Sequence, residues 1–297
     1  MSQKIAPNEP IKAYKAFGKN FKCRGFQYEV GETYHIDGEV KICRKGFHAC
    51  QNCMEVLRYY SLNDSRFAEV EVWGDVVFSE NDSKLCASDI KIVRELTFEE
   101  LFTESYKYFS ENYKVNDNKI RRISNVGLSK TVSDENYCEF ILCGYTANLS
   151  TNGTNVNVIS DECEGIVSTS GFKSTIFSKG AETNVATLGN LGKVGSFGRY
   201  SRIISSSFCG EIKSFGENSI IASVGISSSV SSNGKKSIVL SVGKNSIAKA
   251  KKGNWITLAE YGKTGPICVK TEYVDGKRIK EDTWYKLKKG EFIEVNV

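Results

Sequence analysis

A nine-residue repeat occupies most of the second half of the chain and constrains its fold more than any other feature. Glycine recurs on one nine-residue grid, and Glu162 and Ser207 stand at the two grid points without it. The grid glycines are Gly144, Gly153, Gly171, Gly180, Gly189, Gly198, Gly216, Gly225, Gly234 and Gly243. The residue five places after each grid point is always apolar, and the residue seven places after it is Ser or Thr in eleven of twelve copies. Self-similarity at a fixed short period predicts a repeat architecture.

The consensus, Gly-x-x-Ser-x-(Ile/Val)-x-Ser-x, predicts one short strand and one turn per copy. Positions three, five and seven share a strand face, which is small, branched and small, and positions four and six face solvent. Glycine is expected to supply the tight turn. A unit this short cannot bury its own apolar face, so the copies must stack into a β-solenoid. Two repeats per coil predict six coils and a rod of about 30 Å, and a three-sided coil predicts four rungs. The repeat alone leaves both geometries open.

Two functions of repetitive β-structures are excluded by residue type. Calcium-binding nonapeptides need Asp in every turn, and the repeat region holds only Asp161. Ice binding needs outward hydroxyls, whereas these Ser residues share the face of the buried Ile and Val and should point inward. We therefore interpret the repeats as a stacking scaffold.

The C-terminal residues 253–297 are expected to cap the solenoid, whose last coil otherwise exposes its core and edges. Trp255 is the expected plug. Short strands are predicted at residues 266–270, 273–279, 283–287 and 292–297, with a turn at Asp275-Gly276.

The N-terminal residues do not follow the nine-residue repeat, and their pattern predicts a compact α+β domain. Alternation predicts strands at residues 11–17, 41–43 and 67–73. Asn52 is a plausible N-cap of a helix over residues 52–60, and the capping box from Thr97 to Glu100 opens a helix through about residue 109. The expected organisation is an α+β domain at 1–110, a connecting segment at 111–143, a β-solenoid at 144–252 and a small β cap at 253–297.

Lysines gather near the end of the repeats. They are Lys235, Lys236, Lys244, Lys249, Lys251 and Lys252. A ladder of lysines from rung to rung is a candidate site for phosphates, with nucleic acid as a minor expectation because no aromatic residues interleave. The alternative is a solvated edge that discourages aggregation between sheets.

Four cysteines of the N-terminal domain surround a histidine in the sequence. The group is Cys23, Cys43, His48, Cys50 and Cys53, and it resembles half of a zinc site. No second Cys-x-x-Cys follows, so buried thiols that pack as small apolar groups are the favoured interpretation, without a metal. Cys50 or Cys53 as a nucleophile with His48 as base is a further hypothesis.

Charge and hydropathy limit the kinds of partner and the cellular location that we expect. The formal net charge of +5 permits an acidic partner without demanding one. No apolar stretch reaches 18 residues and the first residues lack an apolar signal region, so we expect no membrane span and no secretion. Ten cysteines are then expected as thiols in a cytosol.

The order of elements in the N-terminal domain resembles ADP-ribosyltransferase-like folds. The resemblance lies in the strand at residues 12–17, Gly46-Phe-His-Ala-Cys50 before a helix, and the strand at 69–72. It implies that Tyr14, His48, Tyr59 and Glu71 line a pocket for NAD. The Ser-Thr-Ser strand of that family is missing, which favours a domain without the transferase activity.

A second resemblance covers more of the chain. Lys22-Cys-Arg-Gly-Phe-Gln-Tyr-Glu-Val-Gly31, Cys43-Arg-Lys-Gly-Phe-His-Ala-Cys50, the repeats and Trp255-Ile-Thr-Leu-Ala-Glu-Tyr261 look like an uncharacterised family of phages and prophages. The resemblance implies an accessory protein in the cytoplasm of a bacterial host.

Three functional hypotheses follow. We expect a binding protein, with no cofactor, that engages and antagonises a bacterial host protein, for instance a defence component, with the solenoid as a rigid arm. The first alternative is an NAD-using transferase, and the second is a virion or oligomeric scaffold assembled through the solenoid.

Overall fold

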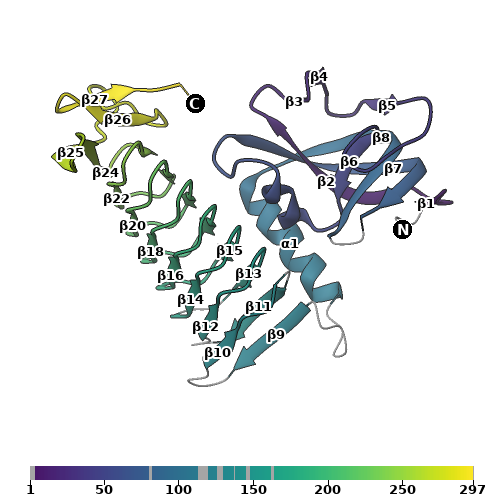
Figure 1. The fold of residues 1–297 in the computed structure, drawn as a ribbon, viewed down its shortest axis with the longest axis horizontal. Helices are drawn as coiled ribbons and strands as arrows, with labels where there is room; N and C mark the ends of the chain where they lie inside the picture. Colours follow the sequence, from purple (N-terminus) through teal and green to yellow (C-terminus); the bar gives the residue numbers. More distant parts are fainter. Residues whose placement is uncertain are drawn as a thin grey trace. The chain divides into compact units, whose positions relative to one another are not determined.

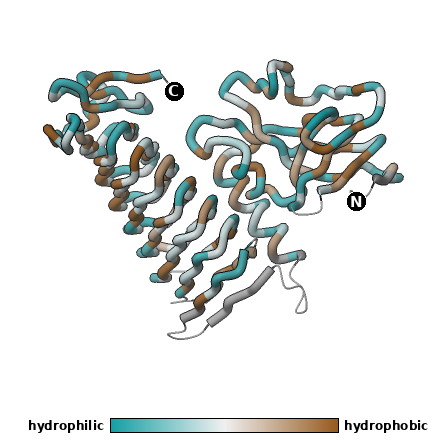
Figure 2. The backbone as a smooth tube through the Cα atoms, in the orientation of Figure 1, coloured by the Kyte–Doolittle hydropathy of each residue, from teal (hydrophilic) through white to brown (hydrophobic). Residues whose placement is uncertain are grey.

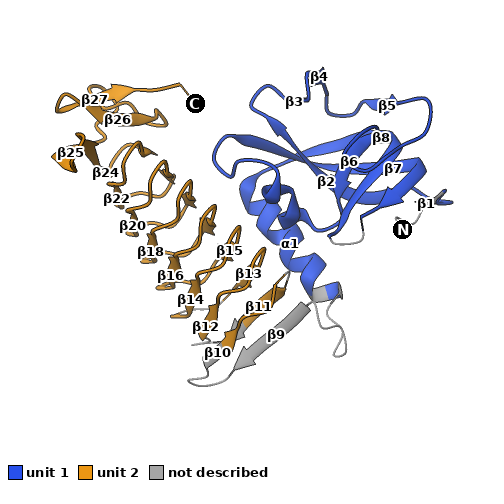
Figure 3. Ribbon diagram, viewed as in Figure 1, with its two compact units in different colours: residues 1–112 blue, residues 113–297 orange. Residues whose placement is uncertain are grey.

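The computed structural model describes residues 4–79, 82–112, 120–125, 130–136, 138–144, 148–161 and 164–296. The chain divides into two compact units, residues 1–112 and 113–297 (Figures 1 and 3). Strands dominate both units, and each unit has a hydrophobic core of its own.

The first unit is a bent sheet that closes on itself. Its strands are β1 (Lys4–Ile5), β2 (Ile11–Gly18), β5 (Thr33–His35), β6 (Phe47–Cys50), β7 (Ser65–Phe78) and β8 (Lys84–Leu96), in the order β1-β7-β2-β6-β8-β5. β7 and β8 also pair with each other along most of their length, so β2, β7, β8 and β6 form a closed ring. Phe17, Val70 and Ile92 belong to the apolar cluster of this unit. A separate hairpin joins β3 (Lys22–Cys23) to β4 (Phe26–Gln27).

Alternation located two of the three strands expected here. β2 and β7 confirm the strands predicted at 11–17 and 67–73. The strand predicted at 41–43 is wrong, because Lys41 and Lys45 close a tight turn instead. Cys43 lies in that turn with φ of 63°, a left-handed conformation that no strand contains.

Both helix starts were correctly predicted from their capping residues. Asn52 caps η1 (Cys53–Arg58), and its side-chain oxygen accepts a hydrogen bond from the Met54 amide at 3.0 Å. This element is a 3-10 helix and shorter than the α-helix expected. Thr97 and Glu100 form the reciprocal capping box of α1 (Phe98–Asn112).

The second unit is a β-solenoid with two sheets. The nine-stranded sheet has the order β10-β12-β14-β16-β18-β20-β22-β24-β25, and the ten-stranded sheet has the order β27-β26-β23-β21-β19-β17-β15-β13-β11-β9. The repeat strands are β9 (Ile120–Asn125), β10 (Lys130–Ser133), β11 (Glu139–Gly144), β12 (Asn148–Thr151), β13 (Asn157–Ser160), β14 (Ile166–Thr169), β15 (Thr175–Ser178), β16 (Asn184–Thr187), β17 (Lys193–Ser196), β18 (Arg202–Ser205), β19 (Glu211–Ser214), β20 (Ile220–Ser223), β21 (Ser229–Ser232), β22 (Ile238–Ser241) and β23 (Ile247–Ala250).

Two repeats make one coil. Successive strands of a sheet pair in parallel with a register of 18 residues, as where Val185 lies beside Ile203 and Ile203 beside Ile221. The β-solenoid predicted from the repeats is confirmed, and the two-sided geometry is the one adopted. It has about seven turns over residues 132–258.

The two sheets begin before the first repeat glycine. β10 and all but the last residue of β11 lie within residues 111–143, which were expected to connect the domains, and these two strands pair in register with β12 and β13. This segment lacks the Gly and Ser consensus but keeps the apolar inward positions, since Phe140 and Leu142 are buried in the solenoid core. Residues 113–119 and 126–129 of the segment lie outside the described residues.

The grid glycines allow close stacking and do not form the turn itself. A Cβ added to Gly171 would lie 1.8 Å from the carbonyl oxygen of Gly153 in the neighbouring coil. The left-handed residue of each turn comes two places later and is not glycine, for example Lys173 with φ of 57°. The expectation that glycine supplies the turn conformation is therefore wrong, because backbone contact between coils is what excludes a side chain.

The C-terminal cap consists of two antiparallel pairs. β24 (Trp255–Tyr261) pairs with β25 (Pro266–Tyr273), and β26 (Tyr285–Lys288) pairs with β27 (Glu291–Glu294). The region predicted as a strand over 273–279 contains a turn instead, in which the Asp275 carboxylate accepts hydrogen bonds from the amides of Lys277 and Ile279.

Trp255 does not plug the core and is 48% exposed. The register between β22 and β24 is 17 residues, one fewer than elsewhere, so Ile256 and Leu258 take the inward positions. Tyr285 and Leu287 of β26 complete the core at this end. Figure 2 shows the hydrophobic segments recurring along the stacked coils.

Candidate functional site

A cavity of about 860 Å³ lies in the first unit. Its wall is built by β2, β6, the hairpin of β3 and β4, β5 and η1, with the turn before β6. These segments are distant in sequence and meet because β6 pairs with both β2 and β8.

Aromatic rings form one part of the cavity wall. Phe26, Tyr28 and Tyr34 contact one another with ring centres 4.8 to 5.3 Å apart, and Phe47 lies 6.3 Å from Tyr28. All four contacts are edge-on, which leaves ring faces for other partners. Flat apolar ligand groups suit such a wall.

The charged residues of the lining are all basic. Five Lys or Arg residues and two His line the cavity, and no Asp or Glu does, among the residues that the structure describes. They are Lys15, Arg24, Arg44, Lys45, Lys84, His35 and His48. A concave surface lined by one sign of charge concentrates ligands of the opposite sign. The cavity therefore favours an anionic ligand.

Lys15 is the deepest of these basic residues, with 5% of its surface exposed. Its Nζ donates a hydrogen bond to the carbonyl oxygen of His48 at 2.8 Å and contacts the Cys23 thiol. Burial lowers the pKa of Lys15, against the opposing influence of the neighbouring thiols.

His48 is held neutral in the cavity wall. Its Nε2 accepts a hydrogen bond from the Cys43 amide at 2.8 Å, so this nitrogen carries no proton. Burial and the nearby charges of Lys15 and Arg24 lower the pKa of His48 to about 4. A ring nitrogen engaged in this way is poorly placed to act as the base of a Cys50 or Cys53 nucleophile.

Tyr59 and Lys84 form a second polar group of the lining. The Tyr59 hydroxyl donates to the Asp82 carboxylate at 2.6 Å and accepts from Lys84 Nζ at 3.1 Å. Burial and the Asp82 hydrogen bond raise the pKa of Tyr59 to about 12, so the phenol stays protonated. The Tyr60 hydroxyl and the Cys23 sulfur, also in the wall, lie 2.9 Å apart.

Comparison with protein families places these residues in a defined domain. Residues 11–104 match the model of a family described as a domain of unknown function (DUF7666). This part of the chain is a DUF7666 domain. All residues that line the cavity fall within the DUF7666 domain, which ends inside α1. No curated protein and no solved structure matches the chain.

Three of the four residues inferred from the transferase resemblance line the cavity of the DUF7666 domain, namely Tyr14, His48 and Tyr59. Glu71 is not among the lining residues. It lies on β7, paired in register with Lys12 of β2 and Lys91 of β8. Of the four residues implied by the resemblance, the two tyrosines and the histidine therefore line the cavity, and the carboxylate does not.

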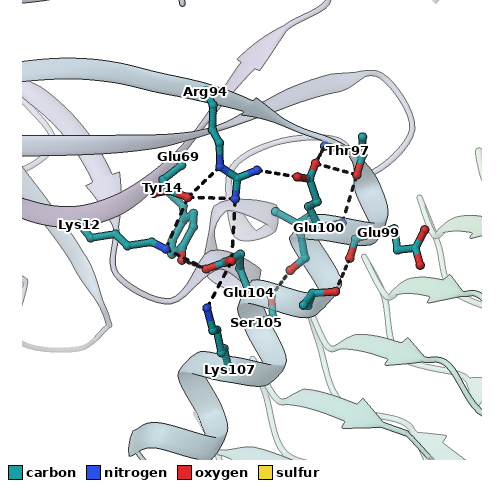
Figure 4. A network of polar contacts seen from close by, with 12 residues as sticks. Lys12, Tyr14, Glu69, Arg94, Thr97, Glu99, Glu100, Glu104, Ser105 and Lys107 are labelled. Carbon is teal, nitrogen blue, oxygen red and sulfur yellow. Dashed lines mark hydrogen bonds and ion pairs between the residues drawn. The ribbon is translucent and has the colours of Figure 1, made fainter. Parts of the chain in front are cut away.

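Tyr14 borders the cavity, and its hydroxyl belongs to a polar network with Glu104 of α1 (Figure 4). The hydroxyl donates to the Glu104 carboxylate of α1 at 2.6 Å, and Lys12 donates to the same oxygen at 2.9 Å. Arg94 links Glu69 to Glu100 in this network. These ion pairs attach α1 to the strands of the DUF7666 domain.

The cysteines near His48 do not assemble into a metal site. Cys50 and Cys53 are buried, Cys23 is partly buried and Cys43 is exposed. Burial raises the pKa of both Cys50 and Cys53, which keeps them as thiols. Within the described parts of the chain, no group of three or more His, Cys, Asp or Glu residues is arranged to hold a metal ion.

The solenoid lysines do not form a ladder. The register of 18 places Lys235 beside Glu217 and Lys244 beside Ile226, not beside other lysines. Lys235 and Lys236 lie in the turn between β21 and β22, and Lys244 lies in the following turn at the opposite edge of the coil. Lys249 lies 4.5 Å from the Trp284 ring centre, Lys251 pairs with Asp282, and Lys252 packs near Gly276. The six lysines therefore make no single phosphate site.

The outward face of the nine-stranded sheet exposes apolar residues, most of them from β18 onwards. Its exposed apolar residues include Ile166, Ile204, Ile220, Ile238, Trp255, Val269 and Tyr273. From β12 to β22 the outward strand positions hold one charged residue, Arg202. Contiguous exposed apolar surface of this kind marks interaction sites.

No sequence motif pointed to Lys15 as a site residue, although a signal for it existed. In the alternating strand at residues 11–17, Lys15 shares a face with Ala13 and Phe17, which predicts an inward-facing lysine.

No described helix of the chain is long and apolar enough to cross a membrane.

Proposed function

We propose that this protein is a binding protein whose DUF7666 domain holds a small anionic ligand with a flat ring. The observation that carries the proposal is the cavity lining, which combines an aromatic wall with five basic side chains and, among the described residues, no carboxylate. Nucleotides and other phosphorylated ring compounds are the ligand class that matches this lining.

Calorimetry on the full chain with three probes tests this proposal. ADP-ribose carries both ring and phosphates, adenosine lacks the phosphates, and pyrophosphate lacks the ring. We expect measurable binding of ADP-ribose and much weaker binding of the other two, because each retains only one half of the recognition. Absence of binding by all three, or equal binding of adenosine and ADP-ribose, would contradict an anion site.

Substitution at the rim of the cavity supplies a matched comparison. Arg24 and Arg44 are exposed lining residues, whereas Lys22 and Lys91 are exposed but lie outside the lining. We expect Arg24→Gln with Arg44→Gln to weaken ADP-ribose binding by about tenfold or more, since charge-assisted hydrogen bonds contribute roughly 1.5–3 kcal/mol each. Lys22→Gln with Lys91→Gln removes the same charge and should leave the affinity nearly unchanged.

The transferase alternative makes a different prediction for Glu71. If this residue is catalytic, Glu71→Gln should abolish transfer of ADP-ribose to host proteins, read as a mass addition. The position of Glu71 outside the cavity lining supports binding over transfer, and we expect Glu71→Gln to bind ADP-ribose as the unsubstituted protein does.

A second function is favoured by the apolar face of the nine-stranded sheet. We propose that the solenoid engages a protein partner through this face. The resemblance to phage proteins makes a bacterial host protein, bound and antagonised in the host cytoplasm, the expected partner. A second copy of this chain is the alternative, in keeping with an oligomeric scaffold.

Co-purification from an infected bacterial lysate, with the mass of the purified protein measured in parallel, distinguishes these partners. Ile204→Lys introduces a charge on the apolar face, where Ile204 is 54% exposed. Phe208→Lys is the control, because Phe208 is 48% exposed but lies in a turn outside this sheet. Loss of a stoichiometric partner in Ile204→Lys alone supports the face, and equal behaviour of both variants contradicts it.

A further inference from the structure

Lys15 stands out among the cavity residues because nothing acidic neutralises it. The side chain projects from the middle of β2, between Ala13 and Phe17 on the same face, and is 95% buried. Its Nζ lies 5.7 Å from the Phe17 ring centre and 5.5 Å from that of Tyr28. No carboxylate is within hydrogen-bonding reach of this nitrogen in the described structure. A buried lysine is normally paired with an acid, and this one is not.

The hydrogen-bond partners of Nζ match a neutral amine. An ammonium group has three N–H donors, whereas a neutral amine has two donors and one lone pair. The surroundings provide two acceptors, the carbonyl oxygen of His48 and the Cys23 sulfur. Both N–H donors of a neutral amine are thereby satisfied, and its lone pair is free. Burial also favours the neutral amine, because it lowers the pKa of Lys15. A desolvated lysine of this kind is a nucleophile towards carbonyl carbon.

A proton donor lies next to this amine. Cys23 contacts Lys15 Nζ and its sulfur lies 2.9 Å from the Tyr60 hydroxyl, and both side chains line the cavity. Burial raises the pKa of Tyr60, so its hydroxyl keeps its proton at neutral pH. Lys15, Cys23 and Tyr60 thus form a chain from a nucleophile to an acid.

We propose that Lys15 forms a reversible imine with a phosphorylated aldehyde bound in the cavity, an inference that rests on the proposed anion-binding function. The Nζ lone pair attacks the aldehyde carbon, and the carbonyl oxygen takes up a proton from the Tyr60 and Cys23 pair. The oxygen then leaves as water with the proton lent by the pair and one amine proton as the C=N bond forms, and solvent returns a proton to the pair. Overall, amine, aldehyde and one proton from solvent give the protonated imine and water, with no oxidant or reductant.

The ligand class follows from the rest of the lining. The ring faces of Tyr28 and Tyr34 accommodate a flat ring, and the basic residues at the rim accommodate a phosphate. An iminium nitrogen keeps one N–H, which still satisfies the His48 carbonyl oxygen. The cavity can therefore hold the adduct without leaving that acceptor unpaired.

Trapping with pyridoxal 5′-phosphate, which carries a ring, a phosphate and an aldehyde, tests the imine. The full chain is incubated with this probe, reduced with borohydride, digested and mapped by mass spectrometry. We expect the reduced adduct on Lys15 in preference to Lys84 of the same cavity and to exposed lysines such as Lys91. Lys15→Met should lose this adduct, and Lys91→Met should retain it.

Pyridoxine 5′-phosphate separates this inference from the function on which it rests, because it keeps the ring and phosphate but has no aldehyde. On the unsubstituted protein it should bind by calorimetry and protect Lys15 from the aldehyde probe. If it binds while Lys15 remains unlabelled, or labelling is spread evenly over exposed lysines, the imine is overturned and the anion site stands. If neither compound binds, both proposals fail.

Discussion

At the scale of single residues, the two serines of each repeat differ in what their hydroxyls do. The serine three places after the grid point bonds to backbone, as Ser246 does to the Gly225 carbonyl oxygen at 2.9 Å. The serine seven places after it is buried without a hydrogen-bond partner in seven described copies, as at Ser196 and Ser214, whereas Ser205 accepts a hydrogen bond from the Ser207 amide. The same residue type therefore has opposite energetic consequences at two positions of one repeat.

Alanine substitution should reveal this difference. Ser246→Ala is expected to lower the free energy of unfolding by about 1–3 kcal/mol, because the hydroxyl loses two hydrogen bonds and the buried Ser228 amide is left unpaired. Ser214→Ala should leave stability unchanged or raise it, because no hydrogen bond is lost and a desolvated hydroxyl is removed. Urea denaturation measures both, and an equal loss in the two variants would refute the distinction.

Ser207 shows how the repeat tolerates a missing glycine. In this coil and its neighbour the residue three places after the grid point is glycine, at Gly210 and Gly192, where six other copies have serine. A Cβ added to Gly210 would lie 2.7 Å from the Ser207 Cβ, and one added to Gly192 would lie 2.8 Å from the Ser207 Oγ. The Ser207 side chain occupies the space that a consensus serine side chain would fill at Gly192 and Gly210.

A double-mutant cycle tests this compensation. Gly210→Ser should destabilise the protein by about 1–3 kcal/mol through overpacking. Adding Ser207→Gly should recover much of that loss, because it removes the clashing atoms and restores the consensus at both positions. Additive free energies of unfolding would show that the two positions are not coupled.

At the scale of elements, α1 is attached to the strands through charge. Glu104 receives hydrogen bonds from Tyr14 and Lys12, and Arg94 joins Glu69 to Glu100. Burial acts to raise the pKa of Glu104, but the hydrogen bonds from Tyr14 and Lys12 outweigh it and hold the pKa below its ordinary value of 4.5. The helix is thus docked by an ionised carboxylate.

This docking predicts a dependence on acid. A carboxylate with a lower pKa in the folded state stabilises that state above its ordinary pKa, and the stabilisation is lost as pH falls through the folded pKa. The melting temperature of the first unit should therefore decline below about pH 4.5, and Glu104→Gln should flatten the decline. Glu99→Gln, on an exposed position of the same helix, is the control. Parallel pH profiles for all three proteins would argue against Glu104.

At the scale of the whole molecule, the solenoid depends on its C-terminal cap. Tyr285 is 2% exposed within the solenoid core, and its hydroxyl accepts a hydrogen bond from the Lys280 amide at 2.8 Å. Stacked coils gain stability from their neighbours, so damage at one end should spread inward by local opening and not unfold the chain at once.

Hydrogen exchange locates such opening. Tyr285→Ala removes a large buried side chain, a change that typically costs about 3–5 kcal/mol, and should speed amide exchange in β22 to β24. Exchange in β7 and β8 should not change, since those strands belong to a separate hydrophobic core. Tyr273→Ala, at an exposed position of β25, is the control. Uniform acceleration along the solenoid would contradict local opening.

The sequence by itself determined the features that repeat over short distances. Nine-residue spacing predicted the strands of the solenoid, alternation predicted β2 and β7, and capping residues predicted the starts of η1 and α1. Each of these depends on residues within a few positions of one another, so a local pattern contains the whole signal.

Tertiary structure alone decided what depends on contacts between distant segments. The pairing of two repeats per coil, the one-residue register change that turns Trp255 outward and the contact of each glycine with the coil before it all arise from stacking. The cavity arises in the same way, since Lys15 meets the carbonyl of His48 across 33 positions of the chain. Strand pairing brings these groups together, and no local spacing in the sequence specifies which strands pair.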